Sequence, residues 1–363
     1  MATDREQMGQ VTGYIAPATK ILRYPGVLSA IQRGERVWPL HVEMDLSGVC
    51  NAHCGHYRFG DRQDGAMMDV EDAEELLEQL AEGGTLAVTF SGGGEPTSNQ
   101  HFDRIVCHAR RCGLRVGVYT NGILGTRLIR VAGVADWIYV SLDADNAEDY
   151  RRIKGIDAFD QVRQTVQRLT VIGAPLPDGP MATGERNRRT FEKVMNARAY
   201  ASVIGVGFLL TGDNWQRAEA MQRLGESLGA DYVQFRPIAG LDTYGWVPDA
   251  LRELERIGAM HSKDRFTDLY DNWRGVYDRG YSVCRGSELG PTIGSDGTVW
   301  VCPNTRGIEG RALGNIKDEP FAEIWKRRET QMVGGDCEPT CRHHALNRTL
   351  ALVCEPQGHE AFV

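Results

Sequence analysis

Strand-like and helix-like segments alternate along the first two thirds of the chain. Short apolar runs typical of strands lie at residues 40–46, 85–90, 115–119, 137–142, 204–210 and 232–235. Amphipathic segments typical of helices lie between them, at residues 70–80, 102–112, 126–131, 159–171 and 215–228. Strands joined by helical crossovers predict a parallel α/β fold. Six units are too few for a closed eight-unit barrel, so we expect an open six-unit barrel or a doubly wound sheet.

The two ends of the chain depart from this alternation. Residues 1–37 predict a helical lead-in, and the alternation stops near residue 240. A stretch rich in Pro, Gly and charge at 174–189 predicts a long surface loop. Beyond residue 240 we expect helices near 248–258 and 264–277, and then a hairpin turn at Asp296-Gly297. The expected domains are therefore a lead-in at 1–37, a barrel at 38–240 and a smaller domain at 241–363.

The charge balance excludes some classes of partner. The 363 residues include 41 Lys and Arg against 49 Asp and Glu, which gives a net charge of −8. Such a chain is a poor bulk binder of nucleic acid or of anionic membranes. Its apolar runs all fall short of the roughly 18 residues that a spanning helix needs. The polar, acid-containing stretch Met1 to Gln10 is not a targeting peptide, so we expect a cytoplasmic protein without nucleic-acid or membrane partners.

Nine cysteines are unevenly spread along the chain. In a reducing cytoplasm they are expected to be buried, catalytic or metal-bound rather than paired in disulfides. Cys50 and Cys54 lie close together, and Cys107 and Cys112 fit an amphipathic segment as buried structural thiols. The remaining five crowd the last quarter of the chain: Cys284, Cys302, Cys337, Cys341 and Cys354. This clustering predicts two separate metal sites.

Polar or glycine-rich residues follow nearly every expected strand. Ligands of parallel α/β folds bind at the carboxyl ends of the strands, so these residues are expected to surround one large polar ligand. An alternative for Asp213 is that it caps the helix starting at Trp215, which we favour. The segments are CNAHCGHY at 50–57, SGGGEP at 91–96, TNG at 120–122, SLD at 141–143 and TGDN at 211–214.

In this order the motifs resemble those of the radical S-adenosylmethionine (SAM) enzymes. That family carries C-x3-C-x2-C after its first strand and GGEP after its second. Here Cys50 and Cys54 keep the first spacing, and Gly93-Gly94-Glu95-Pro96 is intact. The TNG and SLD segments and Tyr150-Arg151-Arg152-Ile153 also look familial, and the resemblance runs from about Pro39 to Cys354. It implies a partial (β/α)6 TIM-like barrel followed by a small cysteine-rich iron–sulfur domain of the SPASM or twitch type.

The resemblance also implies cofactors and their ligands. Three thiolates hold a [4Fe–4S] cluster, SAM binds the fourth iron, and reductive cleavage yields a 5′-deoxyadenosyl radical that abstracts hydrogen from substrate. Glu95 and the GGEP backbone would hold the SAM ammonium, Ser141 the ribose or carboxylate, and Arg152 the carboxylate. Asn121 would shape the pocket. The implied cofactor-binding set is His56, Gly93, Gly94, Glu95, Asn121, Ser141 and Arg152.

The third cysteine of the motif is absent, because its position falls on Tyr57. One explanation is an unusual third ligand, which could be Tyr57, His56 or His53. A second is a degenerate homologue that has lost the cluster. A third is a Cys-to-Tyr variant of an active enzyme. The rest of the SAM-binding set is intact, which disfavours long-standing decay.

The C-terminal cysteines resemble a SPASM or twitch motif. Cys284, Gly297 and Cys302 give C-x12-G-x4-C, and Cys337 and Cys341 follow as C-x3-C. Two further cysteines of a full SPASM domain would fall at Arg328 and Gln331, so one auxiliary cluster is favoured over two. The leading ligand set is Cys284, Cys302, Cys337 and Cys341, with Cys354 either replacing Cys337 or free. The alternative is a zinc site built from the segment CEPTCRHH at 337–344.

The expected function is that of a radical SAM oxidoreductase or maturase. Relatives with SPASM or twitch domains modify peptides or oxidise sugars and aminocyclitols, and we lean towards a peptide or natural-product substrate. An external one-electron donor is implied. Only about 37 residues precede the barrel, so a peptide substrate would require a separate leader-binding partner. The alternatives are a catalytically disabled homologue that keeps only the C-terminal cluster, and a zinc-binding structural protein.

Overall fold

The computed structural model describes residues 20–55, 65–173, 202–238, 243–260, 263–308, 310–334, 337 and 341–354. Its centre is a nine-stranded sheet in the order β6-β5-β4-β3-β2-β1-β7-β8-β9. The first six strands pair in parallel with their neighbours in the chain. They are β1 (His41–Asp45), β2 (Ala87–Ser91), β3 (Arg115–Thr120), β4 (Trp137–Ser141), β5 (Val203–Leu210) and β6 (Tyr232–Pro237).

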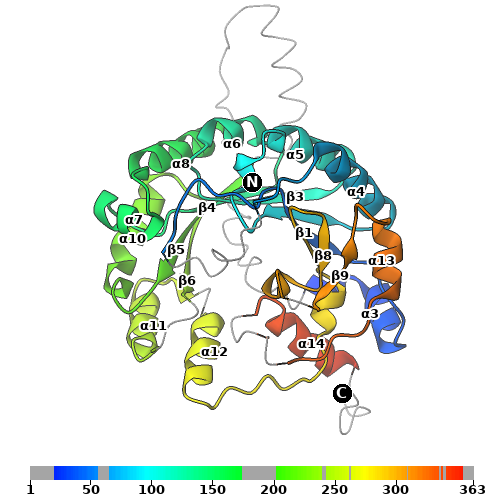
Figure 1. Cartoon of the computed structure of the whole chain (residues 1–363). Helices are drawn as coiled ribbons and strands as arrows, with labels where there is room; N and C mark the ends of the chain where they lie inside the picture. Colours follow the sequence, from blue (N-terminus) through cyan, green and yellow to red (C-terminus); the bar gives the residue numbers. More distant parts are fainter. Residues whose placement is uncertain are drawn as a thin grey trace, which may run out of the picture.

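Helices cover the outer face of this sheet, as Figure 1 shows. The helix α4 illustrates why they form: Asp69 caps its first turn, and Val70, Ala73 and Leu77 lie at helical spacing on its buried face. The acidic residues of α4 occupy the opposite side, as expected for a solvated face. The crossover helices are α4 (Val70–Glu82), α5 (Phe102–Arg111), α6 (Gly125–Val131), α7 (Ala147–Lys154), α8 (Phe159–Gly173) and α10 (Ala218–Ser227).

The strand residues alternate between an apolar outer face and a polar inner face. Val42 and Met44 of β1 belong to the large core beneath the helices, whereas Glu43 and Asp45 lie on the other face. Tyr139 lies across the neighbouring strand, where a Cβ at Gly207 would come within 1.6 Å of the tyrosine oxygen. Glycine is therefore required there for the aromatic ring to lie inside the barrel.

The strand order decides between the two folds expected from the sequence. The six parallel strands follow chain order with no reversal, and the helices lie on one side of the sheet (Figure 1). The fold is therefore a partial (β/α)6 barrel, and the doubly wound alternative is wrong. The short helix α7 was not expected from the sequence. The predicted loop at 174–189 and the helical piece at 191–200 lie outside the described residues.

The C-terminal region extends the barrel sheet. The strand β7 (Thr292–Ile293) pairs in parallel with β1 and antiparallel with β8 (Thr298–Trp300), which pairs with β9 (Ala312–Asn315). The expected turn at Asp296-Gly297 joins β7 to β8, and Gly297 has a φ of 91°. The helices here are α11 (Val247–Arg256), α12 (Lys263–Trp273), α13 (Phe321–Arg327) and α14 (His344–Cys354).

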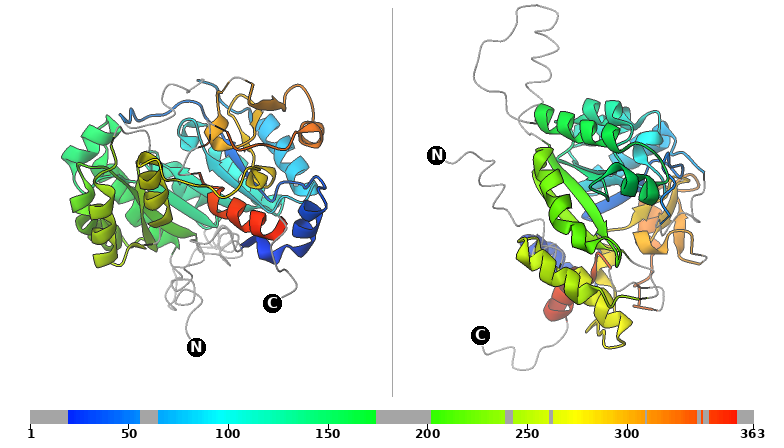
Figure 2. Two further views of the ribbon diagram at one scale, coloured as in Figure 1. Left: turned by 90° about the horizontal axis from the view of Figure 1, so that it is seen from below. Right: turned by 90° about the vertical axis from the view of Figure 1, so that its left-hand side faces the viewer.

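The N-terminal lead-in packs on this C-terminal region. The helix α3 (Pro25–Gln32) lies beside α14 in Figures 1 and 2, and the Gln32 side chain donates a hydrogen bond to the Val353 carbonyl (2.9 Å). A small apolar cluster that includes Ile31 and Leu350 fills this contact. The domain boundaries at residues 37 and 240 stay predictions. Within the described ranges, no helix has the length and apolar character needed to cross a membrane.

Candidate functional site

Cys50 and Cys54 lie in the loop that leaves the carboxyl end of β1. Both thiols are part-buried, and both lie within electrostatic reach of the Lys154 ammonium. Burial raises the pKa of both thiols, and the nearby Lys154 ammonium opposes this effect. His53 is exposed. His56 and Tyr57 lie outside the described residues, so the third ligand position stays a prediction.

The cysteine loop is held on two sides by backbone hydrogen bonds. The N–H groups of His53 and Gly55 donate to the carbonyls of Lys154 (2.8 Å) and Ile153 (3.3 Å) at the end of α7. On the other side, the Glu95 N–H donates to the Val49 carbonyl (2.9 Å). Main-chain hydrogen bonds to the end of α7 and to the GGEP loop therefore fix the position of the cysteine loop.

The second glycine of the GGEP motif is required by this close approach. A Cβ at Gly94 would lie 2.2 Å from the Val49 carbonyl oxygen, which is far inside van der Waals contact. At Gly93 the nearest atom to a Cβ is a carboxylate oxygen of Asp45 at 3.9 Å. Gly94 thus allows the GGEP loop to touch the cysteine loop, and Gly93 leaves room that a Cβ would fill.

Glu95 ties the GGEP loop to the end of β3. Its carboxylate accepts hydrogen bonds from the Thr120 hydroxyl (2.6 Å), the Thr97 N–H (3.1 Å) and the Asn121 N–H (2.7 Å). It is buried, and this burial raises its pKa. The Thr97 N–H bond also makes Glu95 the cap of the short turn Pro96–Ser98. A buried carboxylate beside the cysteines is suited to a cationic ligand group.

Two further predicted residues lie at strand ends near the thiols. The Asn121 amide donates to the side-chain oxygen of Asn51 (2.7 Å) and approaches the Cys50 sulfur at 3.8 Å. The Ser141 hydroxyl donates to Asp143 (2.7 Å). Asn121 therefore lies in contact with the cysteine loop, whereas Ser141 belongs to the polar group around Asp143.

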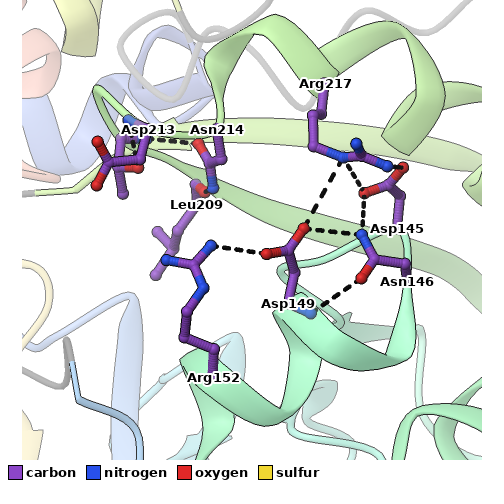
Figure 3. Close-up of polar contacts among 9 residues, drawn as sticks. Asp145, Asn146, Asp149, Arg152, Leu209, Asp213, Asn214 and Arg217 are labelled. Carbon is purple, nitrogen blue, oxygen red and sulfur yellow. Dashed lines mark hydrogen bonds and ion pairs between the residues drawn. The ribbon is translucent and has the colours of Figure 1, made fainter.

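Arg152 and Lys154 occupy opposite environments on the same helix. Arg152 pairs with Asp149, as Figure 3 shows. The two atoms are 2.7 Å apart, and 56% of the Arg152 side chain is exposed. Lys154 is 5% exposed and pairs with the buried Asp143. Burial lowers the pKa of Lys154, but the charges of Asp143 and Cys54 outweigh it and the net shift is upward. The sequence analysis assigned no role to Lys154, although Lys154 directly precedes Gly155 and lies in the last turn of α7.

Asp213 does not cap the helix that follows, as the sequence had led us to expect. The cap position before Trp215 belongs to Asn214, whose side chain accepts a hydrogen bond from the Thr211 N–H (2.7 Å). The Asp213 side chain is exposed, and its N–H donates to the Thr211 hydroxyl (3.2 Å). The polar loop after β5 is therefore closed by Asn214.

A second group of cysteines assembles in the C-terminal region. Burial raises the pKa of Cys341 to about 12, with further contributions from the charges of Cys284, Cys302 and Cys337. These four thiols therefore lie within electrostatic reach of one another. The Asn347 amide donates to the Cys284 sulfur (3.3 Å). A set of four clustered thiols fits the ligand demand of an iron–sulfur cluster.

Cys354 lies away from this group. It ends α14, ten residues beyond His344, which corresponds to about 15 Å along a helix. There it packs against the apolar cluster beneath α3. The two positions where further cysteines were expected are engaged otherwise: Arg328 lies over the Trp325 ring (4.1 Å), and the Gln331 carbonyl accepts from the Cys284 N–H (2.8 Å).

The zinc alternative gains no support from the arrangement of CEPTCRHH. His343 is buried, and Gly290 lies against it. His344 lies beside the Tyr281 hydroxyl at 3.0 Å. In the part of the chain that the structure describes, no three Cys, His, Asp or Glu side chains are grouped to hold a single metal ion.

Fold and site together define a partial barrel with thiols and buried charges at its strand ends and a cysteine-rich extension. The sequence profile of the Radical SAM superfamily matches residues 44–198, and that of the SPASM iron–sulfur cluster-binding domain matches residues 284–350. The chain belongs to the radical SAM enzymes and carries a SPASM domain. The cofactors expected from the resemblance, SAM and [4Fe–4S] clusters, are those of these two families.

Known relatives agree with this assignment. The chain is 25% identical over 319 residues to an AdoMet-dependent heme synthase of Methanosarcina barkeri, covering 80% of this chain and 83% of that protein. It is 26% identical to a PqqA peptide cyclase of Xanthomonas oryzae pv. oryzae, covering 72% and 67%. The SAM-bound structure of Streptococcus suis SuiB has the same fold, with a TM-score of 0.60 at 15% identity, covering 82% of this chain and 68% of SuiB.

Proposed function

We propose that this chain is a maturase that uses a 5′-deoxyadenosyl radical to abstract hydrogen from a peptide. The observation that carries the proposal is the meeting of Cys50, Cys54, Glu95 and Lys154 at the carboxyl ends of the barrel strands. Thiols there suit iron, and buried groups of opposite charge suit a zwitterionic ligand. A [4Fe–4S] cluster bound there would supply the electron that cleaves SAM.

Different residues of the barrel would bind the ammonium and the carboxylate of SAM. Glu95, buried and negatively charged when ionised, would attract the ammonium group of SAM. The ammonium of Lys154, already within electrostatic reach of both thiols, would hold the SAM carboxylate. We assign this role to Lys154 in place of Arg152, because Arg152 is exposed and paired with Asp149. Gly93 leaves space for the ligand, and Asn121 lies at the edge of the same pocket.

The four C-terminal thiols would hold one auxiliary cluster. Cys284, Cys302, Cys337 and Cys341 are its proposed ligands, and Cys354 is left out. This cluster would bind substrate or accept an electron during a net oxidation. An external one-electron donor and a separate leader-binding protein complete the proposed partners, and the proposed location is the cytoplasm.

A peptide substrate is favoured by two of the relatives. One is a PqqA peptide cyclase, and SuiB has also been solved with its precursor peptide SuiA. The heme synthase relative keeps small-molecule substrates open, including the sugars and aminocyclitols expected from the sequence. On the inner face of the barrel, Arg236 lies over the rings of Tyr119 (5.1 Å) and Tyr139 (4.4 Å). This aromatic and cationic wall suits a polar substrate.

Tyr57 favours a second candidate function, that of a disabled homologue. Such a protein would keep the auxiliary cluster and lack the ability to cleave SAM. The two candidate functions differ in whether the protein forms 5′-deoxyadenosine from SAM. Reduced, reconstituted protein incubated with SAM is expected to form 5′-deoxyadenosine, measured by mass spectrometry. Deuterium transfer from a labelled peptide into that product would support the peptide substrate, whereas no 5′-deoxyadenosine, with Tyr57→Cys restoring it, would establish the disabled homologue.

A further inference from the structure

Two buried acids of β1 meet two arginines of the SPASM domain. Arg306 contacts Asp45 through two nitrogens, Nε to Oδ2 at 2.6 Å and Nη2 to Oδ1 at 2.8 Å. The same Nη2 donates to Glu43 (2.6 Å), and Arg342 pairs with the second oxygen of Glu43. Glu43, Asp45 and Arg306 are each less than a tenth exposed. We call these four residues the β1 ionic seam.

Each arginine of the seam is tied to a proposed auxiliary-cluster ligand. Arg342 directly follows Cys341, and Arg306 follows Cys302 after a single 3-10 turn, Pro303–Thr305. This turn is closed by Thr305, whose hydroxyl donates to the Cys302 carbonyl (2.8 Å) and whose N–H donates to the same carbonyl (3.1 Å). The turn therefore ties the backbone of Arg306 to that of Cys302, and the carboxylates of Glu43 and Asp45 hold the guanidinium.

At its other end the seam reaches the SAM-binding loop. The same Asp45 oxygen that contacts Arg306 Nε accepts a hydrogen bond from the Gly93 N–H (3.2 Å). Gly94 and Glu95, the next two residues, contact the chain beside Cys50 through the Ser47 and Val49 carbonyls (both 2.9 Å). A continuous set of buried contacts thus joins Cys302 to the GGEP loop.

The charges make this connection sensitive to each member. The two acids and two arginines of the seam balance, so removing Arg306 leaves buried carboxylates short of a partner. Without Arg306, the Asp45 carboxylate also loses the ion pair that holds it against the Gly93 N–H. Removing Arg342 is milder, because Arg342 contacts Glu43 and Arg306 still reaches both acids.

We propose that Arg306 is a positioning residue that transmits the order of the auxiliary-cluster site to the GGEP loop. When Cys302 is held by its cluster, Arg306 holds Asp45, and Asp45 holds the Gly93 amide in the geometry that receives SAM. When Cys302 is released, the GGEP loop loosens. This inference rests on the proposed auxiliary ligands and is independent of SAM cleavage.

Amide hydrogen exchange of the GGEP loop tests the proposal without any turnover. Reconstituted protein without SAM is compared with Arg306→Gln, Cys302→Ala and the double variant, using a peptide that covers residues 91–99. We expect exchange about tenfold faster in each single variant, with the double variant no faster than Arg306→Gln. Arg342→Gln is the matched control and is expected to change the exchange by less than about threefold.

Three results would overturn the proposal. They are unchanged exchange in Arg306→Gln, unchanged exchange in Cys302→Ala, and additive effects in the double variant. A peptide covering residues 159–170 of α8 reports global destabilisation and is expected to stay unchanged. Should Arg306→Gln fail to fold, Arg306→Lys keeps the charge but loses the two-nitrogen contact, and it is expected to show the same loosening to a smaller extent. Iron analysis of Cys302→Ala verifies loss of the auxiliary cluster, so failure of the ligand assignment is distinguished from failure of the seam.

Discussion

The two cysteine sites of this molecule differ in what completes them. In the SPASM domain Cys284, Cys302 and Cys337 all lie within electrostatic reach of Cys341. In the barrel two thiols share one loop, and the third ligand position falls on Tyr57. The proposed ligands of the SPASM site are therefore four thiols, whereas the third ligand of the barrel site depends on the role of Tyr57.

The two sites also differ in charge. The barrel thiols lie near the buried Glu95 and Lys154, which carry opposite charges. At the SPASM site the neutral amide of Asn347 donates to the Cys284 sulfur, and the neighbouring cation is the part-buried Arg279, which donates to the Cys337 carbonyl (2.6 Å). Buried charges require partners. Here Glu95 accepts a hydrogen bond from the Asn121 N–H, and Lys154 is paired with Asp143. This contrast agrees with our proposal that the barrel site binds SAM and that the SPASM site holds an auxiliary cluster.

The largest expected effect is loss of one whole cluster. Cys341→Ala should remove about four irons per chain from reconstituted protein and leave the iron of the barrel site in place, since the two sets of thiols belong to separate parts of the fold. Iron and sulfide analysis measures this change. Cys354→Ala is the matched control and should retain all iron. Equal iron loss in both variants would show that Cys354 is a ligand after all.

Lys154→Met should strongly destabilise the barrel site. It leaves the buried Asp143 without its cation, which is expected to lower the free energy of unfolding by about 3–5 kcal/mol. SAM binding should be lost as well. Arg152→Gln removes an exposed charge from the same helix and should cost less than about 1 kcal/mol. Denaturant unfolding and SAM titration of both variants check this, and a larger effect from Arg152→Gln would reverse the assignment.

Acidification should weaken SAM binding through Glu95. Burial raises the pKa of this carboxyl, so it takes up a proton at a higher pH than an exposed glutamate does. The protonated form no longer attracts the SAM ammonium, and affinity is expected to fall as pH decreases. Glu95→Gln should bind SAM about tenfold more weakly and lose this pH dependence. SAM titrations across pH measure both effects, and an unchanged pH profile in Glu95→Gln would contradict the role of Glu95.

The smallest expected effect concerns the SPASM cluster. Asn347→Leu removes the N–H that donates to the Cys284 sulfur and is expected to make the reduction potential of the auxiliary cluster more negative. The physical reason is that this hydrogen bond stabilises the extra negative charge of the reduced cluster. Potentiometric titration followed by EPR measures the shift. A reduction potential that stays the same or rises would contradict the proposed role of Asn347 at the SPASM site.

The sequence predicted the parts of this molecule that depend on local pattern. The six barrel strands, their crossover helices apart from α7, and the Asp296-Gly297 turn follow from apolar periodicity and turn chemistry. Lys154 was missed because a lysine in the last turn of a helix is normally solvated, and only the tertiary contact with Asp143 buries it. Asp213 was misassigned because the cap position belongs to Asn214, whose side chain accepts a hydrogen bond from the Thr211 N–H and not from the turn that follows.

The contacts of the β1 ionic seam could not be predicted from the sequence. Glu43 and Arg306 are 263 residues apart, and no local pattern connects them. Their contact arises because β7 pairs with β1, which brings the SPASM domain against the inner face of the barrel. Long-range pairing of this kind follows from the fold and not from spacing along the chain.

The central claim is that the barrel site holds a working cluster despite Tyr57. The direct measurement is anaerobic reconstitution with iron and sulfide analysis, followed by EPR of the reduced protein with and without SAM, beside Tyr57→Cys. The account predicts about eight irons in the unmodified chain and a spectrum that SAM perturbs. About four irons and a spectrum insensitive to SAM, with about eight irons only in Tyr57→Cys, would contradict it.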